Sequence, residues 1–348
     1  MHSRDSFVRL IICYFICLCL AVYSFCNRLS PTGFALSDTA FFESETHFTS
    51  SQEEIPPETE NEPQQEKETS QPVSSQETVS ASAQAVKGKV VTRYISPYTA
   101  PISYNKAYMK NSSGLSVSVK DLLNSNIKFK ISENSSPQVL IMHTHTTETF
   151  MEKSADFYTD EYKARTTDNN KNMVKIGDIV AEKLNASGIK TLHDKTKHDY
   201  PEYTGSYGRS AKTVTEYLKK YPSIKVVLDL HRDSVSMGGN DKAKLVTEIN
   251  GKKAAQVMLV MGSQSGSVKN HPNWKENLKL ALKLQQTMET KYPTLARPLL
   301  LMPKNYNQKL TIGSMLIEFG TDVNTLQEAC YSAELVGESL VSMLKTLK

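Results

Sequence analysis

Two segments that contain histidine and one glutamate have the residue types of a metal-dependent hydrolase. His143 and His145 come directly after one apolar run, His231 comes after a second, and Glu318 lies within a third. Imidazole nitrogens and carboxylate oxygens suit Zn²⁺, which in catalytic sites keeps one position open for water. A bound zinc ion lowers the pKa of that water to ~7, and a nearby glutamate can transfer its proton. These residues therefore indicate hydrolysis of an amide without a covalent intermediate.

These side chains come together only if the apolar runs are strands of one sheet. Gln138–Met142, Ile224–Leu230 and Ser314–Gly320 have the length and composition of buried strands. Two further strand candidates and four helical patterns alternate with them: strands at 189–193 and 256–262, and helices at 168–186, 210–220, 274–290 and 326–347. Catalytic groups in open α/β sheets gather beyond the carboxyl ends of strands. We predict an α/β fold with a single, mainly parallel sheet flanked by helices.

Each of these residues also has a plain structural explanation. The spacing of His143 and His145 puts both side chains on one face of an extended segment, which suits chelation but occurs by chance. His231 is followed by Arg-Asp and could belong to a salt-bridged strand end, and Glu318 could pair with a lysine. Their shared place at strand exits favours the functional explanation. The other histidines of this region, at 193, 198 and 271, are expected at the surface.

The N-terminus has the pattern of a membrane anchor. Residues 10–26 are uncharged and almost wholly apolar, and Arg4 and Arg9 precede them. This length is near the lower limit for crossing ~30 Å of hydrocarbon, and the positive flank favours an N-terminus in the cytoplasm with the rest outside. A cleaved signal peptide is the alternative, but no small-x-small cleavage site follows. We expect an uncleaved single-pass helix.

The charge changes sign along the rest of the chain. Residues 29–85 hold eleven Asp and Glu against one Lys, whereas residues 86–348 hold 37 Lys and Arg against 25 Asp and Glu. The first segment is also too poor in large apolar residues to fold, so we predict a disordered linker. The basic body favours an anionic partner, and its extracytoplasmic position disfavours nucleic acid. The predicted order is an anchor (1–28), a linker (29–86), a lead-in that packs on the catalytic domain (87–136), and the catalytic domain (137–348).

Four stretches together resemble the stage II sporulation protein P family of endospore formers. They are Val139–Phe150, Leu228–Ser234, Lys304–Leu310 and Met315–Ala329, and they occur in the family's order. The resemblance runs from about Asn111 to the C-terminus, and the N-terminal anchor and polar linker also look like that family. It implies a zinc-dependent N-acetylmuramoyl-L-alanine amidase that acts on peptidoglycan, with a cell-wall-amidase-like fold.

The resemblance also implies roles for individual residues. His145 and His231 match the two zinc-binding histidines, and Glu318 matches the catalytic glutamate. The acidic ligand stays open, because Asp168 stands where the family has Glu and Glu148 is an alternative. Asp168 could equally be the N-cap of a helix. His143 could replace or supplement the acidic ligand.

The remaining expectations concern the substrate and the partners. Arg232 could hold a stem-peptide carboxylate with two hydrogen bonds, or it could pair with Asp229 or Asp233. The resemblance implies a second, endopeptidase activity on stem peptides, work at the sporulation septum during engulfment, and partnership with a stage II sporulation protein D-like lytic transglycosylase. Two alternatives stay open: a non-catalytic, wall-binding septal scaffold, and a zinc peptidase that cuts only stem peptides.

Overall fold

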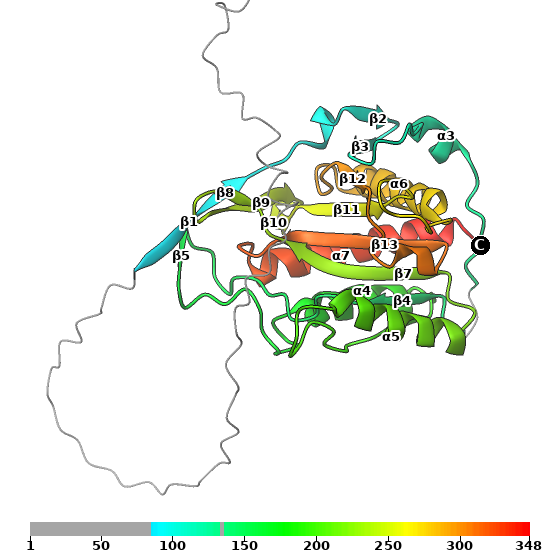
Figure 1. Cartoon of the computed structure of the whole chain (residues 1–348). Coiled ribbons are helices and arrows are strands. Elements are labelled where there is room, and N and C mark those ends of the chain that lie inside the picture. Colours follow the sequence, from blue (N-terminus) through cyan, green and yellow to red (C-terminus); the bar gives the residue numbers. More distant parts are fainter. Residues whose placement is uncertain (1–84, 133–135) are drawn as a thin grey trace, which may run out of the picture. The chain divides into compact units, whose positions relative to one another are not determined.

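The computed structural model describes residues 85–132 and 136–348, which form two β-sheets and the helices around them (Figure 1). The larger sheet has eight strands in the order β2, β3, β12, β11, β13, β7, β4, β6. Their bounds are β2 Ile102–Tyr104, β3 Ala107–Asn111, β4 Val139–Met142, β6 Thr191–His193, β7 Val226–Asp233, β11 Val257–Gly262, β12 Leu299–Met302 and β13 Gly313–Thr321. The predicted α/β class is confirmed.

The strands of the larger sheet run in two opposed groups. β13, β7, β4 and β6 are parallel to one another, and β11, β12 and β3 are parallel to one another. The groups meet where β11 pairs antiparallel with β13, and β2 forms an antiparallel hairpin with β3. Because β4, β7 and β13 share one direction, their carboxyl ends meet at the same edge of the sheet. The residues that follow or end these strands are the ones with the predicted chemistry.

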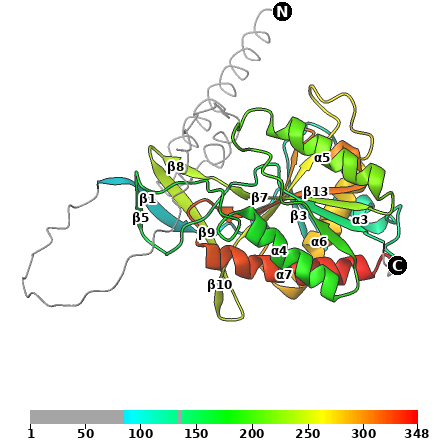
Figure 2. The same ribbon diagram turned by 90° about the horizontal axis from the view of Figure 1, so that it is seen from below.

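Different helices cover the two faces of this sheet, as Figure 2 shows. The helices are α3 Val119–Asn124, α4 Met173–Ala186, α5 Ser206–Lys220, α6 Trp274–Lys291 and α7 Leu326–Lys345. Leu228 and Ile317 belong to the core that also contains apolar residues of α4, α6 and α7, whereas Val227 packs with Leu140 and with Val214 of α5. Side chains of a strand alternate between faces, so His231 shares the α5 face with Val227.

A second, five-stranded sheet joins segments that are far apart in the chain. Its path is β10, β9, β1, β5, and β8 pairs with β9. The bounds are β1 Val86–Arg93, β5 Phe157–Thr159, β8 Ser236–Gly238, β9 Asp241–Ile249 and β10 Lys252–Ala255. β1 is parallel to β9 and antiparallel to β5. The prediction of one mainly parallel sheet is therefore wrong: there are two sheets, both mixed, because short hairpins and returning strands carry no mark of direction in their hydrophobic pattern.

The predicted membrane helix of residues 10–26 and nearly all of the predicted linker lie outside the described residues. Within the described ranges, no helix is both long enough and apolar enough to span a membrane.

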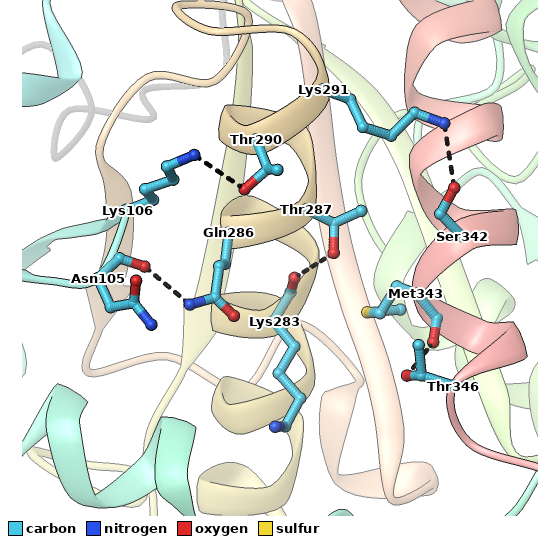
Figure 3. Close-up of a pocket in the computed structure, with 10 residues that line it drawn as sticks. All are labelled: Asn105, Lys106, Lys283, Gln286, Thr287, Thr290, Lys291, Ser342, Met343 and Thr346. Carbon is cyan, nitrogen blue, oxygen red and sulfur yellow. Dashed lines mark hydrogen bonds between the residues drawn. The ribbon is translucent and has the colours of Figure 1, made fainter.

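A hollow of about 500 Å³ lies on the face that α6 and α7 cover, beside the turn between β2 and β3 (Figure 3). Three lysines line it, Lys106, Lys283 and Lys291, together with hydroxyl and amide groups. Their ammonium groups donate to neutral oxygens, such as the Ser342 hydroxyl at 3.0 Å from Lys291 Nζ. The hollow is therefore a basic surface feature, on the opposite side of the sheet from His231.

His271 is buried, contrary to the expectation of a surface position. Its side chain is 0% exposed, and burial lowers its pKa to about 4. A histidine in an unfolded chain has a pKa near 6.5. Between about pH 6.5 and 4, His271 is therefore protonated to a greater extent in the unfolded chain than in the folded one. The free energy of unfolding is therefore not reduced by His271 above about pH 6.5. It falls as the pH drops from about 6.5 towards 4, because protonation then favours the unfolded chain.

Replacing His271 by glutamine should therefore flatten the acid side of the stability curve. Between about pH 7 and 4.5, the wild-type free energy of unfolding should fall by roughly 2 to 3 kcal/mol more than that of the variant. Urea unfolding at both pH values measures this difference. Parallel losses in the two proteins would show that His271 does not contribute to acid sensitivity.

A candidate metal centre

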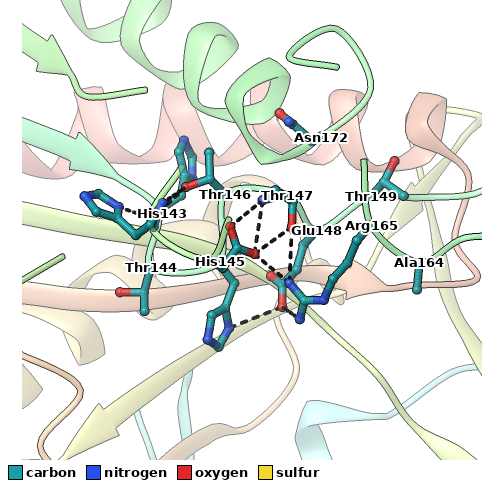
Figure 4. Close-up of polar contacts among 12 residues, drawn as sticks. His143, Thr144, His145, Thr146, Thr147, Glu148, Thr149, Ala164, Arg165 and Asn172 are labelled. Atoms are coloured by element: carbon teal, nitrogen blue, oxygen red, sulfur yellow. Dashed lines mark hydrogen bonds and ion pairs between the residues drawn. The ribbon is translucent and has the colours of Figure 1, made fainter. Parts of the chain in front are cut away.

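His145, Glu148 and His231 form one cluster of potential metal ligands. One ligand atom from each side chain lies within 4.8 Å of the others, and no other such group occurs in the described ranges. His145 Nδ1 lies 3.4 Å from Glu148 Oε1, and His231 Nδ1 lies 3.5 Å from Glu148 Oε2. The three residues are only 6%, 5% and 3% exposed. Figure 4 shows the imidazole of His145 directed towards the carboxylate of Glu148.

The chain after β4 turns sharply, and this turn creates the cluster. Residues 144–147 form a turn, and an antiparallel bridge between Glu148 and Arg165 follows it. The Glu148 backbone N–H donates to the carbonyl of His145 at 3.3 Å, which closes the turn. His145 and Glu148 consequently lie on the same side, above the strand end that carries His231.

Glu148 is a buried carboxylate held in its charged form. Burial alone would raise the pKa of Glu148, but Arg232, His145 and His231 outweigh it and hold the pKa well below its usual value. The backbone N–H of Arg232 donates to Glu148 Oε2 at 3.2 Å. A buried anion between two imidazole nitrogens is a donor set that suits a divalent cation.

His231 is held between two carboxylates. Its Nε2 lies 2.8 Å from Asp229 Oδ1, while its Nδ1 faces Glu148. Burial alone would lower the pKa of His231, but Asp229 and Glu148 outweigh it and raise the pKa well above its usual value. Both carboxylates therefore favour the charged form of the His231 imidazole.

Glu318 lies beside the cluster without joining it. It is opposite His231 in the register of the parallel strands β13 and β7, so the two side chains share the α5 face. Burial raises the pKa of Glu318 well above its usual value; Asp233 and Glu148 add to this rise, and His231 opposes it. Glu318 Oε2 has no hydrogen-bond partner among the described residues. A carboxyl that is close to the cluster and has a free oxygen has the properties of a proton-transfer group.

Asp168 does not approach the cluster. It is exposed, and its Oδ1 accepts a hydrogen bond from the backbone N–H of Asn170 at 2.9 Å. The N-cap of α4 is Asn172, whose side chain accepts from Val174 N at 3.0 Å, so the N-cap predicted at Asp168 is wrong. The helix begins at Met173, which is the first apolar residue of the pattern and lies five residues after the predicted start at Asp168, because the residues between them form a polar loop.

His143 points away from His145. Its Nδ1 is 2.9 Å from the carbonyl oxygen of Leu230, and its Nε2 is 2.8 Å from Nε2 of His193. Burial and His193 lower its pKa to about 3, so the ring is neutral. The expectation that both imidazoles share a face is wrong, because the segment turns at Thr144 and does not stay extended. His193 and His198 are likewise packed inside and are not solvated.

Arg232 makes contacts inside the protein. Its Nε donates to the carbonyl of Thr149 at 3.2 Å, and its Nη2 donates to that of Ala164 at 2.7 Å. Asp233, a predicted partner, pairs instead with Arg297 at 2.9 Å. Arg232 therefore links the segment of Glu148 and Thr149 to the segment of Ala164 and Arg165.

Sequence reasoning missed the residues that cover the cluster. The ring of Tyr203 lies 4.8 Å from that of His145, and the guanidinium of Arg165 lies 4.6 Å above Tyr203. Arg165 Nη1 is 2.6 Å from Asp199, and its Nη2 is 3.8 Å from Glu148 Oε1. Its side chain remains 27% exposed. These residues lie in polar loops without periodicity, so only their chemistry, not their place, could be guessed.

The comparisons with known proteins identify sequence relatives. The family model described as stage II sporulation protein P matches residues 32–341 of this chain. A curated relative, stage II sporulation protein P of Bacillus subtilis (strain 168), is 30% identical over 216 residues. That alignment covers 59% of this chain and 50% of the relative, so the chain spans about half the length of the curated protein that it matches.

Several solved structures are similar to this chain at low identity. N-acetylmuramoyl-L-alanine amidase AmiC2 of Nostoc punctiforme is 12% identical and has a TM-score of 0.37, with 61% of this chain and 98% of that chain covered. The CwlD amidase of Clostridioides difficile, solved with the GerS lipoprotein, is 12% identical with a TM-score of 0.38, and 60% and 98% of the two chains are covered.

Proposed function

The chain belongs to the stage II sporulation protein P family, as its four motifs predicted, and on this premise we propose that it is a zinc-dependent N-acetylmuramoyl-L-alanine amidase. The substrate would be peptidoglycan, and the bond cut would be the amide between the lactyl group of muramic acid and L-alanine. The observation that carries the proposal is the convergence of His145, Glu148 and His231, with Glu318 in register beside His231.

The donor set fits zinc. His145, Glu148 and His231 would hold the ion, and two imidazoles with one carboxylate leave a fourth position for water. The charged Glu148 between two Nδ1 atoms already provides the anionic side of such a site. Bound zinc would supply Lewis acidity, which lowers the pKa of a bound water and polarises the amide carbonyl.

Glu318 would perform the proton transfers. Its position beside His231 places a carboxyl next to the metal ligands but outside their group. The charge of a divalent ion would favour the carboxylate form of Glu318, which is then able to accept a proton from water. The same carboxyl would deliver that proton to the nitrogen of the departing L-alanine.

Two arginines would have separate duties. Arg232 would keep Thr149 and Ala164, and with them the backbone beside Glu148 and Arg165, in place. Arg165 retains exposed donors next to Glu148, so we assign to it the contact with a stem-peptide carboxylate that the sequence suggested for Arg232.

The wider proposal follows the family. The protein would act at the sporulation septum during engulfment, held to the membrane by residues 10–26, with a stage II sporulation protein D-like lytic transglycosylase as partner. An additional endopeptidase activity on cross-linked stem peptides belongs to the same proposal.

Mass spectrometry of purified sacculi digested with the full chain tests the function. An amidase should release intact stem peptides from glycan strands, and elemental analysis should find about one zinc per chain. Split stem peptides without glycan release would favour the zinc-peptidase alternative. Binding to sacculi without any cleavage, by a zinc-free chain, would favour the wall-binding scaffold.

A further inference from the structure

A buried series of hydrogen bonds connects the Lys304–Leu310 segment to Asp229, whose carboxylate forms an ion pair with His231. Asn307 Nδ2 donates to Ser210 Oγ at 3.0 Å, and Ser210 Oγ lies 2.9 Å from Thr144 Oγ1. Thr144 Oγ1 donates to Asp229 Oδ2 at 2.7 Å, and Asp229 Oδ1 lies 2.8 Å from His231 Nε2. Thr144 and Ser210 are completely buried. Asn307, Ser210 and Thr144 have no role in the proposed reaction as described above.

The groups at the two ends of this series determine which group donates in each hydrogen bond. The Asp229 carboxylate can only accept, so the Thr144 hydroxyl must donate to it and must itself accept from Ser210. The Ser210 hydroxyl then accepts from the amide of Asn307, which is a donor. Ser210 Oγ also lies 3.3 Å from the carbonyl oxygen of Tyr207, but its contact with Thr144 is shorter, at 2.9 Å, and donation there makes the hydrogen bonds run from Asn307 towards Asp229. Buried polar groups that are satisfied in this way are held in one arrangement.

Thr144 links the two segments that carry the proposed ligands. It precedes His145 directly, and both its backbone N–H, at 2.8 Å, and its hydroxyl donate to Asp229. Asp229 precedes His231 by two residues on β7 and shares its face. The contact between Thr144 and Asp229 consequently sets the distance between the segments of His145 and His231.

The backbone of the Lys304–Leu310 segment is unusual where it meets this chain of bonds. Tyr306 and Asn307 both adopt left-handed backbone angles, with φ of 48° and 56°. Such a conformation costs of order 1 kcal/mol or more for a residue other than glycine, and it persists where the surroundings require it. Here it places the Asn307 amide on Ser210 and on the carbonyl of Tyr207 at 2.8 Å.

We propose that Asn307, Ser210 and Thr144 are positioning residues that hold Asp229 against His231 Nε2, so that Nδ1 is the atom offered to the metal. The inference rests on the proposed function, because it assumes that His145, Glu148 and His231 bind zinc. Carboxylates that accept the second ring N–H of a ligating histidine fix its orientation, and their loss typically weakens metal affinity about 10- to 100-fold. Thr144 would act on this affinity through Asp229.

Zinc affinity of the full chain, measured by competition with a chromophoric chelator, tests the proposal. Thr144→Val keeps the shape of the side chain and removes the hydroxyl, and it should weaken zinc binding about 10- to 100-fold. Thr144→Ser keeps the hydroxyl, and it should remain within about threefold of the wild type. A loss caused only by altered packing would not be rescued by serine, since serine removes the methyl group.

Two further measurements keep the outcome decisive. Thermal unfolding of the metal-free variants identifies a fold defect, and if Thr144→Val unfolds, Ser210→Ala replaces it and should weaken zinc binding in the same direction. Wild-type affinity in a folded Thr144→Val chain would overturn the proposal while leaving the amidase assignment intact. If the zinc affinities of the variants are as expected but the wild-type chain cuts no amide, the proposed function is wrong and the positioning role stands. A wild-type chain that binds no zinc would overturn both.

Discussion

Replacing Glu318 by glutamine should lower the rate of amide hydrolysis on purified sacculi by about 10²- to 10⁴-fold. Glutamine has the same shape as glutamate but can neither accept the water proton nor return it to the leaving nitrogen. No described residue hydrogen bonds to Glu318 Oε2, so the change at that atom breaks no contact of the fold. The rate is measured as glycan-free stem peptide released over time.

The controls separate this role from a structural one. Zinc content and the thermal unfolding temperature of Glu318→Gln should match those of the wild type, because Glu318 is not a member of the ligand group. If the variant releases stem peptides at the wild-type rate, Glu318 is not the proton-transfer residue. A variant that loses zinc would instead make Glu318 a ligand.

Replacing His231 by alanine should remove most of the bound zinc. The substitution takes away one of three ligand side chains and leaves the charged Glu148 buried without the imidazole that faces it at 3.5 Å. The loss of affinity should exceed the ~10- to 100-fold that is typical of residues behind the ligands. Elemental analysis after gel filtration measures the zinc that each chain retains.

The same assay decides the third ligand. Glu148→Gln should lose zinc as His231→Ala does, whereas Asp168→Asn should keep the wild-type content, since Asp168 is exposed and bonded to Asn170. Unchanged zinc in both His231→Ala and Glu148→Gln would contradict the assignment of the cluster. Loss of zinc in Asp168→Asn would require that its loop moves to the cluster when the metal binds.

The strands that matter for the site were predictable because each is a short, fully buried apolar run. β4, β7 and β13 all occur where the sequence places them, and their common direction brings His145, His231 and Glu318 to one edge. The rule that functional groups follow strand ends needs only the position of each strand. It does not need the helices or the strand order, which are harder to predict.

Other features depend on contacts that no local pattern records. The pairing of β1 with β9 joins residues about 150 positions apart, and the reversal of β11 against β13 depends on how the chain returns from β12. The choice between Glu148 and Asp168 depended on a turn at residues 144–147. That turn also separates His143 from His145, because side chains alternate regularly only in an extended segment.

Arg232 and Arg165 show the same limit for charged side chains. The residue next to a proposed ligand in sequence, Arg232, donates inward to two carbonyls, whereas Arg165, 66 positions from His231 in the chain, reaches the cluster. Charge and proximity in sequence identify which groups could contact a substrate. Which of these groups keeps exposed N–H donors for a substrate depends on the fold, and here Arg165 is 27% exposed whereas Arg232 is buried.

The burial of the cluster has a consequence for how quickly a metal ion would exchange. Tyr203 lies against His145, Arg165 lies over Tyr203, and His145, Glu148 and His231 are only 6%, 5% and 3% exposed, so we expect an ion to enter or leave when the surrounding side chains open locally. The rate of local opening should therefore limit both the binding and the release of the metal ion. A chain that has acquired its ion should keep it through prolonged dialysis, and stripping by a strong chelator should proceed at a rate that the chelator concentration does not change.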